Sequence, residues 1–119
     1  MRRVVVTGMG AVTPVGNHLE EYWDSLTNGV CGVDFITRFD ASDKKVQIAA
    51  EVKNFDPLEY FEKSDLRKND LFVQYAVAAA EQAMRDSGAQ GTIEPERFGV
   101  YIGSGIGGIL TTTENSNKL

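Results

Sequence analysis

Three segments of the chain have the apolar character that is typical of β-strands. Residues 4–6 are consecutive valines followed by Thr7 and Gly8, and residues 98–103 form a second apolar run that ends in glycine. Continuous apolar runs of this length predict strands that are covered on both faces of a parallel or mixed sheet. Residues 47–52, which have lysines on both sides, predict a further and more exposed strand.

After the first of these segments, the apolar residues recur at helical spacing between residues 19 and 26. Asn17 followed three residues later by Glu20 predicts a helix that begins with a capping box. Asn28-Gly29 is expected to end this helix after about three turns. Asp56-Pro57 predicts a short helical turn that runs through Tyr60.

The strongest helical pattern predicts one continuous helix from residue 64 or 65 to Ser87, closed by Gly88. Its many alanines would allow another backbone to approach closely. The order strand, helix, strand, short helix, long helix, strand predicts an α/β fold. The apolar stripe of the long helix consists of Phe72, Tyr75, Ala76, Ala79, Ala80, Ala83 and Met84.

Composition excludes several classes of function. The chain has 119 residues, 42% hydrophobic and 24% charged, which is typical of a soluble globular protein. A net charge of -5 argues against a nucleic-acid partner, since phosphate binding needs a surplus of cations. The longest apolar run near the N-terminus is too short for a signal peptide or a membrane span, so we expect a cytoplasmic location and no membrane partner. Cys31 is the only cysteine, which excludes an intrachain disulfide and a cysteine-rich zinc site, and no cofactor or metal is expected.

The first glycine motif resembles the start of a dinucleotide-binding fingerprint. Gly8 and Gly10 follow an apolar run, but the third glycine position falls on Thr13, and Pro14 follows it. The spacing therefore argues against a nucleotide site. We expect these glycines to shape the connection between a strand and a helix without touching a ligand.

The second glycine motif covers residues 103–108. It lacks the Lys-Ser/Thr pair of a phosphate-binding loop, which excludes that interpretation. Glycines on both sides of Ile106 allow positive φ angles and leave it as the one large side chain in the motif. From the residues alone, a core isoleucine under a tight turn is the favoured interpretation.

Residues 4–16, 66–75 and 99–108 together resemble the N-terminal part of bacterial β-ketoacyl-[acyl-carrier-protein] synthases, with synthase II of fatty-acid elongation as the nearest match. The resemblance implies a thiolase-like fold of two related α/β halves in five layers (αβαβα), and a homodimer. Residues 1–119 would form the N-terminal portion of the first half, with no complete second domain. We therefore expect an N-terminal fragment.

The same resemblance implies an acyltransferase that elongates fatty acids by decarboxylative Claisen condensation of an acyl thioester with malonyl-carrier protein. An active-site cysteine and two histidines perform this reaction in the family. Those residues belong to segments that would follow Leu119, so no residue here is assigned as catalytic and the chain alone is expected to be inactive. We expect Cys31 to be a small buried or half-buried residue and His18 to lie on the surface.

The resemblance also implies two sites that do fall within this chain. Arg67 and Lys68 match a basic patch that receives the acidic acyl carrier protein, and Lys63 is a nearby addition. The alternative is a solvated helix end, because the charges of residues 62–70 balance. Cations in the first turns of a helix oppose its dipole, which favours the docking interpretation. Ile106 matches the residue that faces the acyl-chain pocket near the dimer interface.

Two alternatives to an elongating synthase remain open at this stage. One is a protein of the same fold, either a non-catalytic chain-length-factor-like partner or a polyketide ketosynthase. The other is a nucleotide-binding α/β domain. The acyl chain length and the pathway are not determined by these residues.

Overall fold

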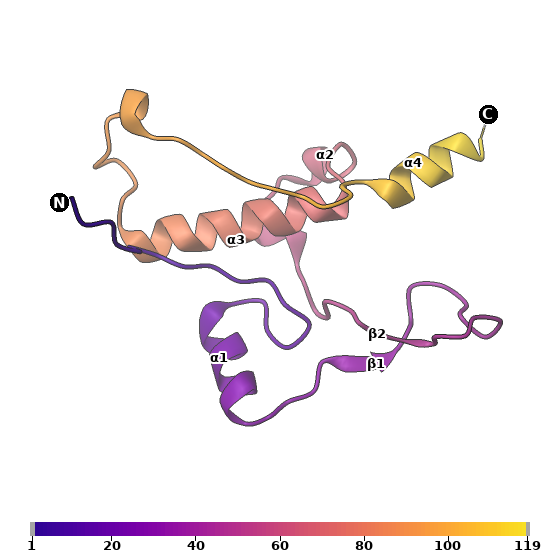
Figure 1. Cartoon of the computed structure of the whole chain (residues 1–119). Helices are drawn as coiled ribbons and strands as arrows, with labels where there is room; N and C mark the ends of the chain where they lie inside the picture. Colours follow the sequence, from indigo (N-terminus) through magenta and orange to yellow (C-terminus); the bar gives the residue numbers. More distant parts are fainter. Residues whose placement is uncertain (1, 119) are drawn as a thin grey trace. The chain divides into compact units, whose positions relative to one another are not determined.

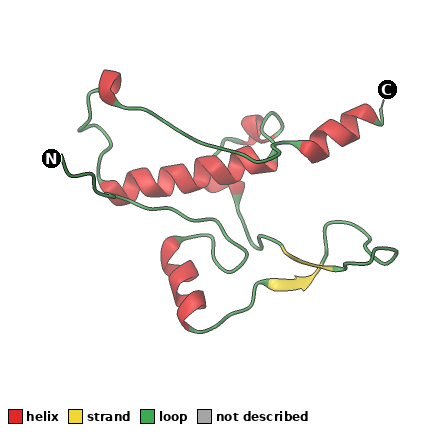
Figure 2. Ribbon diagram, in the orientation of Figure 1, coloured by secondary structure: helices red, strands yellow, loops and turns green. Residues whose placement is uncertain are grey.

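The computed structural model describes residues 2–118. By its contacts, the chain divides into two units. The middle unit is Ala11–Phe55, and the helical unit combines Met1–Gly10 with Asp56–Leu119. Figure 1 labels the elements along the chain, and Figure 2 shows that helices and loops make up most of it. No helix among the described residues is long and apolar enough to cross a membrane.

The middle unit begins with helix α1 (Leu19–Thr27), which ends at Asn28 as the sequence predicts. The predicted capping box is wrong. His18 is the N-cap residue and makes no capping hydrogen bond with its side chain. Instead, Glu21 accepts a hydrogen bond from the Asn17 backbone N–H at 2.8 Å, because Glu21, one residue beyond Glu20, is the carboxylate that reaches back to the start of the helix.

The middle unit also contains a two-stranded antiparallel sheet of β1 (Val33–Phe35) and β2 (Ile48–Ala50), in which Val33 is opposite Ala50 and Phe35 is opposite Ile48. The predicted strand at residues 47–52 is confirmed by β2. Its partner β1 was not predicted, because β1 is only three residues long and places Asp34 between two apolar residues.

The helical unit contains a 3-10 turn at Pro57–Glu59, α2 (Lys63–Leu66), α3 (Leu71–Ser87), a second 3-10 turn at Pro95–Arg97, and α4 (Ile109–Ser116). The short turn after Asp56 was predicted correctly, and the Asp56 carboxylate accepts the Leu58 N–H. Helix α4 was not predicted.

The single long helix expected from residue 64 or 65 to Ser87 is interrupted. Asp70 has extended backbone angles (φ -64°, ψ 158°), and its carboxylate accepts the Leu71 N–H as an N-cap. The apolar spacing continues through this break, so periodicity alone could not reveal it. Gly88 ends α3 in the left-handed conformation (φ 60°), as predicted.

The predicted strands at residues 4–6 and 98–103 are not strands in the structure. No described residue forms a β-ladder with either segment, and their apolar side chains are exposed, 96% for Val4 and 68% for Val100. A strand exists only when a neighbour supplies its hydrogen bonds. Neither segment has such a neighbour within residues 2–118, so the strand prediction is wrong for both.

Close backbone contact with α3 explains the first glycine motif. A Cβ atom at Gly8 would lie 2.5 Å from the Ser87 nitrogen and still closer to the carbonyl oxygen of Ala83. The Met9 N–H donates to the Asp86 carboxylate at 2.9 Å. The expectation that the alanines of the long helix admit another backbone is confirmed, whereas the glycines do not connect a strand to a helix, because residues 4–6 are not a strand.

The described residues have almost no apolar core. Ala41 in the middle unit and Ala78 in α3 are their only buried hydrophobic residues. The predicted stripe of α3 is half-buried, except for Phe72, which is 38% exposed. Large apolar side chains therefore lie on the surface of both units.

Candidate functional site

The three candidate docking cations gather around the short helix α2. Lys63 is its first residue, and Arg67 is the C-cap residue that follows Leu66. The break before α3 therefore places Arg67 and Lys68 at the end of a helix and not in the first turns of a long one. Cations are favourable at a helix C-terminus, so the helix-dipole argument for a docking role is wrong.

All three cations are exposed, as both a docking patch and a solvated helix end require, and one of them forms an ion pair. The Lys68 ammonium pairs with the Asp65 carboxylate at 3.1 Å, and its side chain remains 73% exposed. Among residues 2–118, no carboxylate forms an ion pair with Lys63 or Arg67. Two of the three positive charges thus have no ion-pair partner within the described chain.

The second glycine motif is an exposed loop, residues 103–108, which we call the glycine loop. Ile106 is 76% exposed. Gly107 has a positive φ of 70°, as the glycine pattern allows, and its N–H donates to the Ser104 hydroxyl at 3.0 Å. A Cβ atom at Gly107 would lie 3.6 Å from the ring of Phe72, so this loop lies next to the start of α3.

Asp70 joins the start of α3 to the start of α4, and the sequence analysis did not identify it. One carboxylate oxygen accepts the Leu71 N–H at 2.6 Å, and the other accepts the hydroxyl of Thr111. An Asp that directly precedes an apolar helical stripe is a common N-cap signal. The contact with Thr111, 41 residues away, has no local signal.

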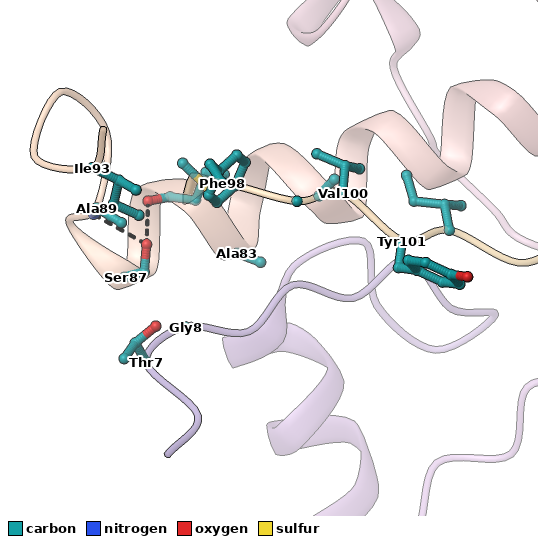
Figure 3. Close-up of a pocket in the computed structure, with 13 residues that line it drawn as sticks. Thr7, Gly8, Ala83, Ser87, Ala89, Ile93, Phe98, Val100 and Tyr101 are labelled. Carbon is teal, nitrogen blue, oxygen red and sulfur yellow. Dashed lines mark hydrogen bonds between the residues drawn. The ribbon is translucent and has the colours of Figure 1, made fainter. Parts of the chain in front are cut away.

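An apolar pocket of about 340 Å³ lies on α3 in the helical unit. Figure 3 shows Thr7 and Gly8 on one side and the segment with Phe98, Val100 and Tyr101 on another. The hydroxyl of Ser87 is already used, since it donates to the Met84 carbonyl and accepts the Ala89 N–H. The lining residues include no carboxylate, histidine, lysine or cysteine, so this pocket offers no carboxylic acid, imidazole, amine or thiol for catalysis.

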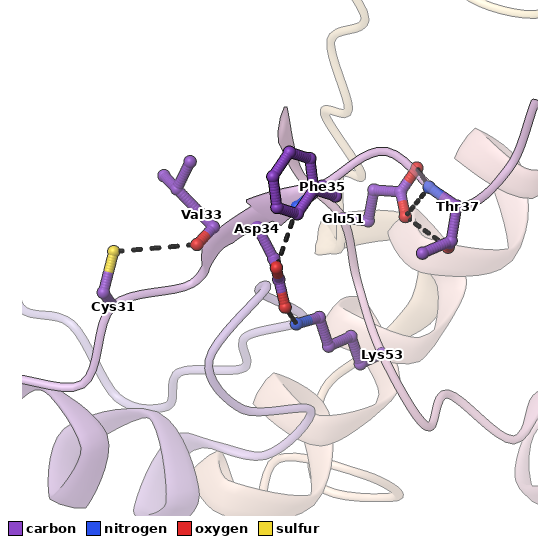
Figure 4. Close-up of polar contacts among 7 residues, drawn as sticks. All are labelled: Cys31, Val33, Asp34, Phe35, Thr37, Glu51 and Lys53. Atoms are coloured by element: carbon purple, nitrogen blue, oxygen red, sulfur yellow. Dashed lines mark hydrogen bonds and ion pairs between the residues drawn. The ribbon is translucent and has the colours of Figure 1, made fainter. Parts of the chain in front are cut away.

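Cys31 lies beside β1 and is exposed, so the expectation of a buried or half-buried residue is wrong. Its Sγ lies 3.9 Å from the Val33 carbonyl oxygen, as Figure 4 shows. His18 is exposed, as expected.

Three carboxylates of the middle unit, Asp34, Asp40 and Glu51, make contacts that lower their pKa values, and Figure 4 shows the contacts of Asp34 and Glu51. The Phe35 N–H and the Lys53 ammonium, at 2.8 and 3.1 Å, lower the pKa of Asp34. The hydroxyl of Thr37, at 2.7 Å, is the main cause of the lowered pKa of Glu51. These contacts link residues of the two strands and the segments next to them. Within residues 2–118, no group of three His, Cys, Asp or Glu residues is arranged to hold a metal.

All 119 residues match the family model described as the β-ketoacyl synthase N-terminal domain, and the chain belongs to this family. Two curated relatives are both named 3-oxoacyl-[acyl-carrier-protein] synthase 2. The Coxiella burnetii protein is 48% identical over 119 residues, which cover 99% of this chain and 29% of the relative. The Vibrio harveyi protein is 52% identical over 109 residues, which cover 91% of this chain and 26% of the relative. The chain thus spans less than a third of the length of these relatives.

Two solved structures are similar to this chain. The ishigamide ketosynthase/chain length factor superposes with a TM-score of 0.75 at 31% identity, over 98% of this chain and 30% of that one. A β-ketoacyl synthase from Burkholderia phymatum gives a TM-score of 0.61 at 31% identity, over 76% of this chain and 22% of that one. Both neighbours are ketosynthases, so the fold of this chain is that of the thiolase-like ketosynthases.

Proposed function

We propose that residues 1–119 form the N-terminal portion of a 3-oxoacyl-[acyl-carrier-protein] synthase of the second type. Such an enzyme elongates an acyl thioester by decarboxylative Claisen condensation with malonyl-carrier protein. The observation that carries the proposal is the match of the chain to relatives of this name, at 43–52% identity over 109 to 119 residues.

The finer architecture belongs to the same proposal. The chain would supply part of the first α/β half of a five-layer αβαβα protein that acts as a homodimer. The apolar segments 4–6 and 98–103 support this, because both are exposed and unpaired within the described chain. Runs with this pattern are characteristic of strands that are covered on both faces.

The proposed reaction needs catalytic groups that these residues do not supply. A cysteine nucleophile requires a lowered pKa, and the developing oxyanion requires preorganised donors. The family uses one cysteine with two histidines, whereas this sequence has one cysteine and one histidine. Cys31 lies in a stretch that does not match the family's cysteine motif, and the resemblance places the catalytic cysteine and both histidines in later segments, so under this proposal catalysis belongs to residues outside this chain.

The chain would contribute to carrier-protein docking through Lys63, Arg67 and Lys68. Arg67 and Lys68 match the family's basic patch, and the charges of Lys63 and Arg67, which have no ion-pair partner within residues 2–118, are available to an acidic partner. Complementary charge of this kind accelerates association and orients the partner.

Ile106 would contribute to the acyl-chain pocket. Its side chain is 76% exposed and has glycines on both sides, so it is not held in a packed core of the described chain. A side chain without neighbouring Cβ atoms can change rotamer at small cost, which suits the mouth of a pocket.

A second candidate function is a non-catalytic partner of the same fold. The observation behind it is the TM-score of 0.75 with a structure whose name includes both a ketosynthase and a chain length factor. The test uses a synthase of the relatives' full length whose first 119 residues are this sequence, here called the full-length synthase. Purified alone, it should release carbon dioxide from malonyl-carrier protein and form a 3-oxoacyl product. Absence of both, with activity only beside a second ketosynthase, would favour the non-catalytic partner.

A further inference from the structure

The carboxylate of Asp70 lies between the first turns of two helices. One oxygen accepts the Leu71 N–H at 2.6 Å and caps α3. The other accepts the hydroxyl of Thr111, in the first turn of α4. A charged acceptor shared in this way satisfies an open N–H of α3 and ties α4 to it.

Gly108 makes this arrangement possible. A Cβ atom at position 108 would lie 2.5 Å from the Asp70 carboxylate oxygen Oδ2 and 3.3 Å from its Cγ. The next glycine before it, Gly107, has φ 70° and faces the Phe72 ring. The C-terminal end of the glycine loop is thus seated on the first residues of α3 by a hydrogen bond and by a close approach that requires glycine.

We propose that Asp70 is a positioning residue that holds the glycine loop, and with it Ile106, at the start of α3. The functional part of this inference rests on the proposed role of Ile106 in the acyl pocket. Because Ile106 is exposed, its own packing within the described chain does not fix the loop. The contacts at positions 107, 108 and 111 fix the end of the loop next to Ile106, and only Asn69 separates Asp70 from Lys68.

The test replaces Thr111 in the full-length synthase. Thr111→Val removes the donated hydrogen bond and keeps the side-chain shape, and Thr111→Ser restores the hydroxyl. Thr113→Val is the matched control, because the Thr113 hydroxyl donates to the Ile109 carbonyl within α4 at 2.8 Å. Asp70→Ser is a second variant, since a serine can still cap α3 but has one oxygen only.

Two measurements are made on each variant: amide exchange of residues 103–112, followed by mass spectrometry, and the ratio of acyl transfer from long and short acyl-carrier proteins. Loss of one charge-assisted hydrogen bond should speed the exchange by about tenfold in Thr111→Val and in Asp70→Ser. Discrimination between long and short chains should fall in the same two variants. Thr113→Val and Thr111→Ser should resemble the unmodified synthase in both measurements.

The outcomes separate this inference from the proposed function. Equal exchange in Thr111→Val and Thr113→Val, in an active synthase, would overturn the positioning role and leave the proposed function standing. Faster exchange with unchanged chain-length discrimination would overturn it too, since Asp70 would then be structural only. Faster amide exchange in the two variants of a synthase that forms no condensation product would support the contact of Asp70 with Thr111 and overturn the proposed function.

Discussion

Gly10 lies directly against Ala79: a Cβ atom at position 10 would collide with the carbonyl oxygen of Ala79 in α3. It would also lie 2.8 Å from the Cβ of Gln82. The Gly-x-Gly pattern that resembles a nucleotide fingerprint is therefore required by contact between the backbone and a helix, and the small residues of α3 face it. Glycine is the only residue that permits this approach.

The first prediction follows from that contact. Gly10→Ala in the full-length synthase should lower its stability by about 1–3 kcal/mol, because the new methyl group has to displace helix backbone. Thermal unfolding measures the effect. Gly105→Ala is the matched control, since a Cβ there meets nothing within 4 Å and the residue lies in the exposed glycine loop. Equal melting temperatures for the two variants would show that the segment does not lie on α3 as described.

The second prediction concerns docking of the carrier protein. Arg67→Glu combined with Lys68→Glu should weaken binding of the acidic carrier and slow its association, with the deficit shrinking as salt rises. Binding kinetics at low and high ionic strength provide the measurement. Lys44→Glu with Lys45→Glu changes the same charge in the middle unit and should have a smaller effect. Carrier affinity that is unchanged at low salt would contradict the docking role and show that Arg67 and Lys68 are ordinary solvated surface residues.

The third prediction concerns Ile106. Ile106→Phe in the full-length synthase should selectively reduce transfer of long acyl chains and change the melting temperature little. Ile109→Phe, at a residue that is 54% exposed in α4, is the matched control. Overpacking of an ordinary core typically costs about 1–3 kcal/mol regardless of substrate. A lower melting temperature with activity lost evenly across chain lengths would therefore identify Ile106 as core.

The fourth prediction concerns pH. Contacts with Thr37 lower the pKa of Glu51 in the folded chain below its ordinary value of 4.5. A lowered folded-state pKa means that the contact stabilises above the ordinary value and that this contribution is lost as the pH falls through the folded-state pKa. The melting-temperature difference between the unmodified synthase and Glu51→Gln should thus be present at neutral pH and vanish in acid. A difference that persists in acid would contradict this assignment, and Glu94→Gln serves as the control, because this N-cap makes no side-chain capping bond.

The sequence predicted the elements that local chemistry determines. The end of α1 at Asn28, the strand β2 and the left-handed cap at Gly88 all follow from residues within a few positions. The break at Asp70 was missed because the apolar period runs through it, although an N-cap residue stood there. The segments at 4–6 and 98–103 were misassigned because a strand depends on partners that are distant in sequence.

The same distinction between local and distant determinants applies to the residues of the candidate site. Residue type and resemblance were sufficient to select Arg67, Lys68 and Ile106, and the structure places each of them in an exposed position. The role of Asp70 could not be predicted, because its contact with Thr111 crosses 41 residues and leaves no periodic trace in the sequence.

The central proposal is that this chain belongs to a condensing enzyme while its catalytic groups lie elsewhere in that enzyme. The most direct test measures carbon dioxide release from malonyl-carrier protein by the 119-residue chain and by the full-length synthase, side by side. The proposal predicts release by the full-length synthase and none above background by the chain alone. Release by the chain alone that Cys31→Ser abolishes would contradict it.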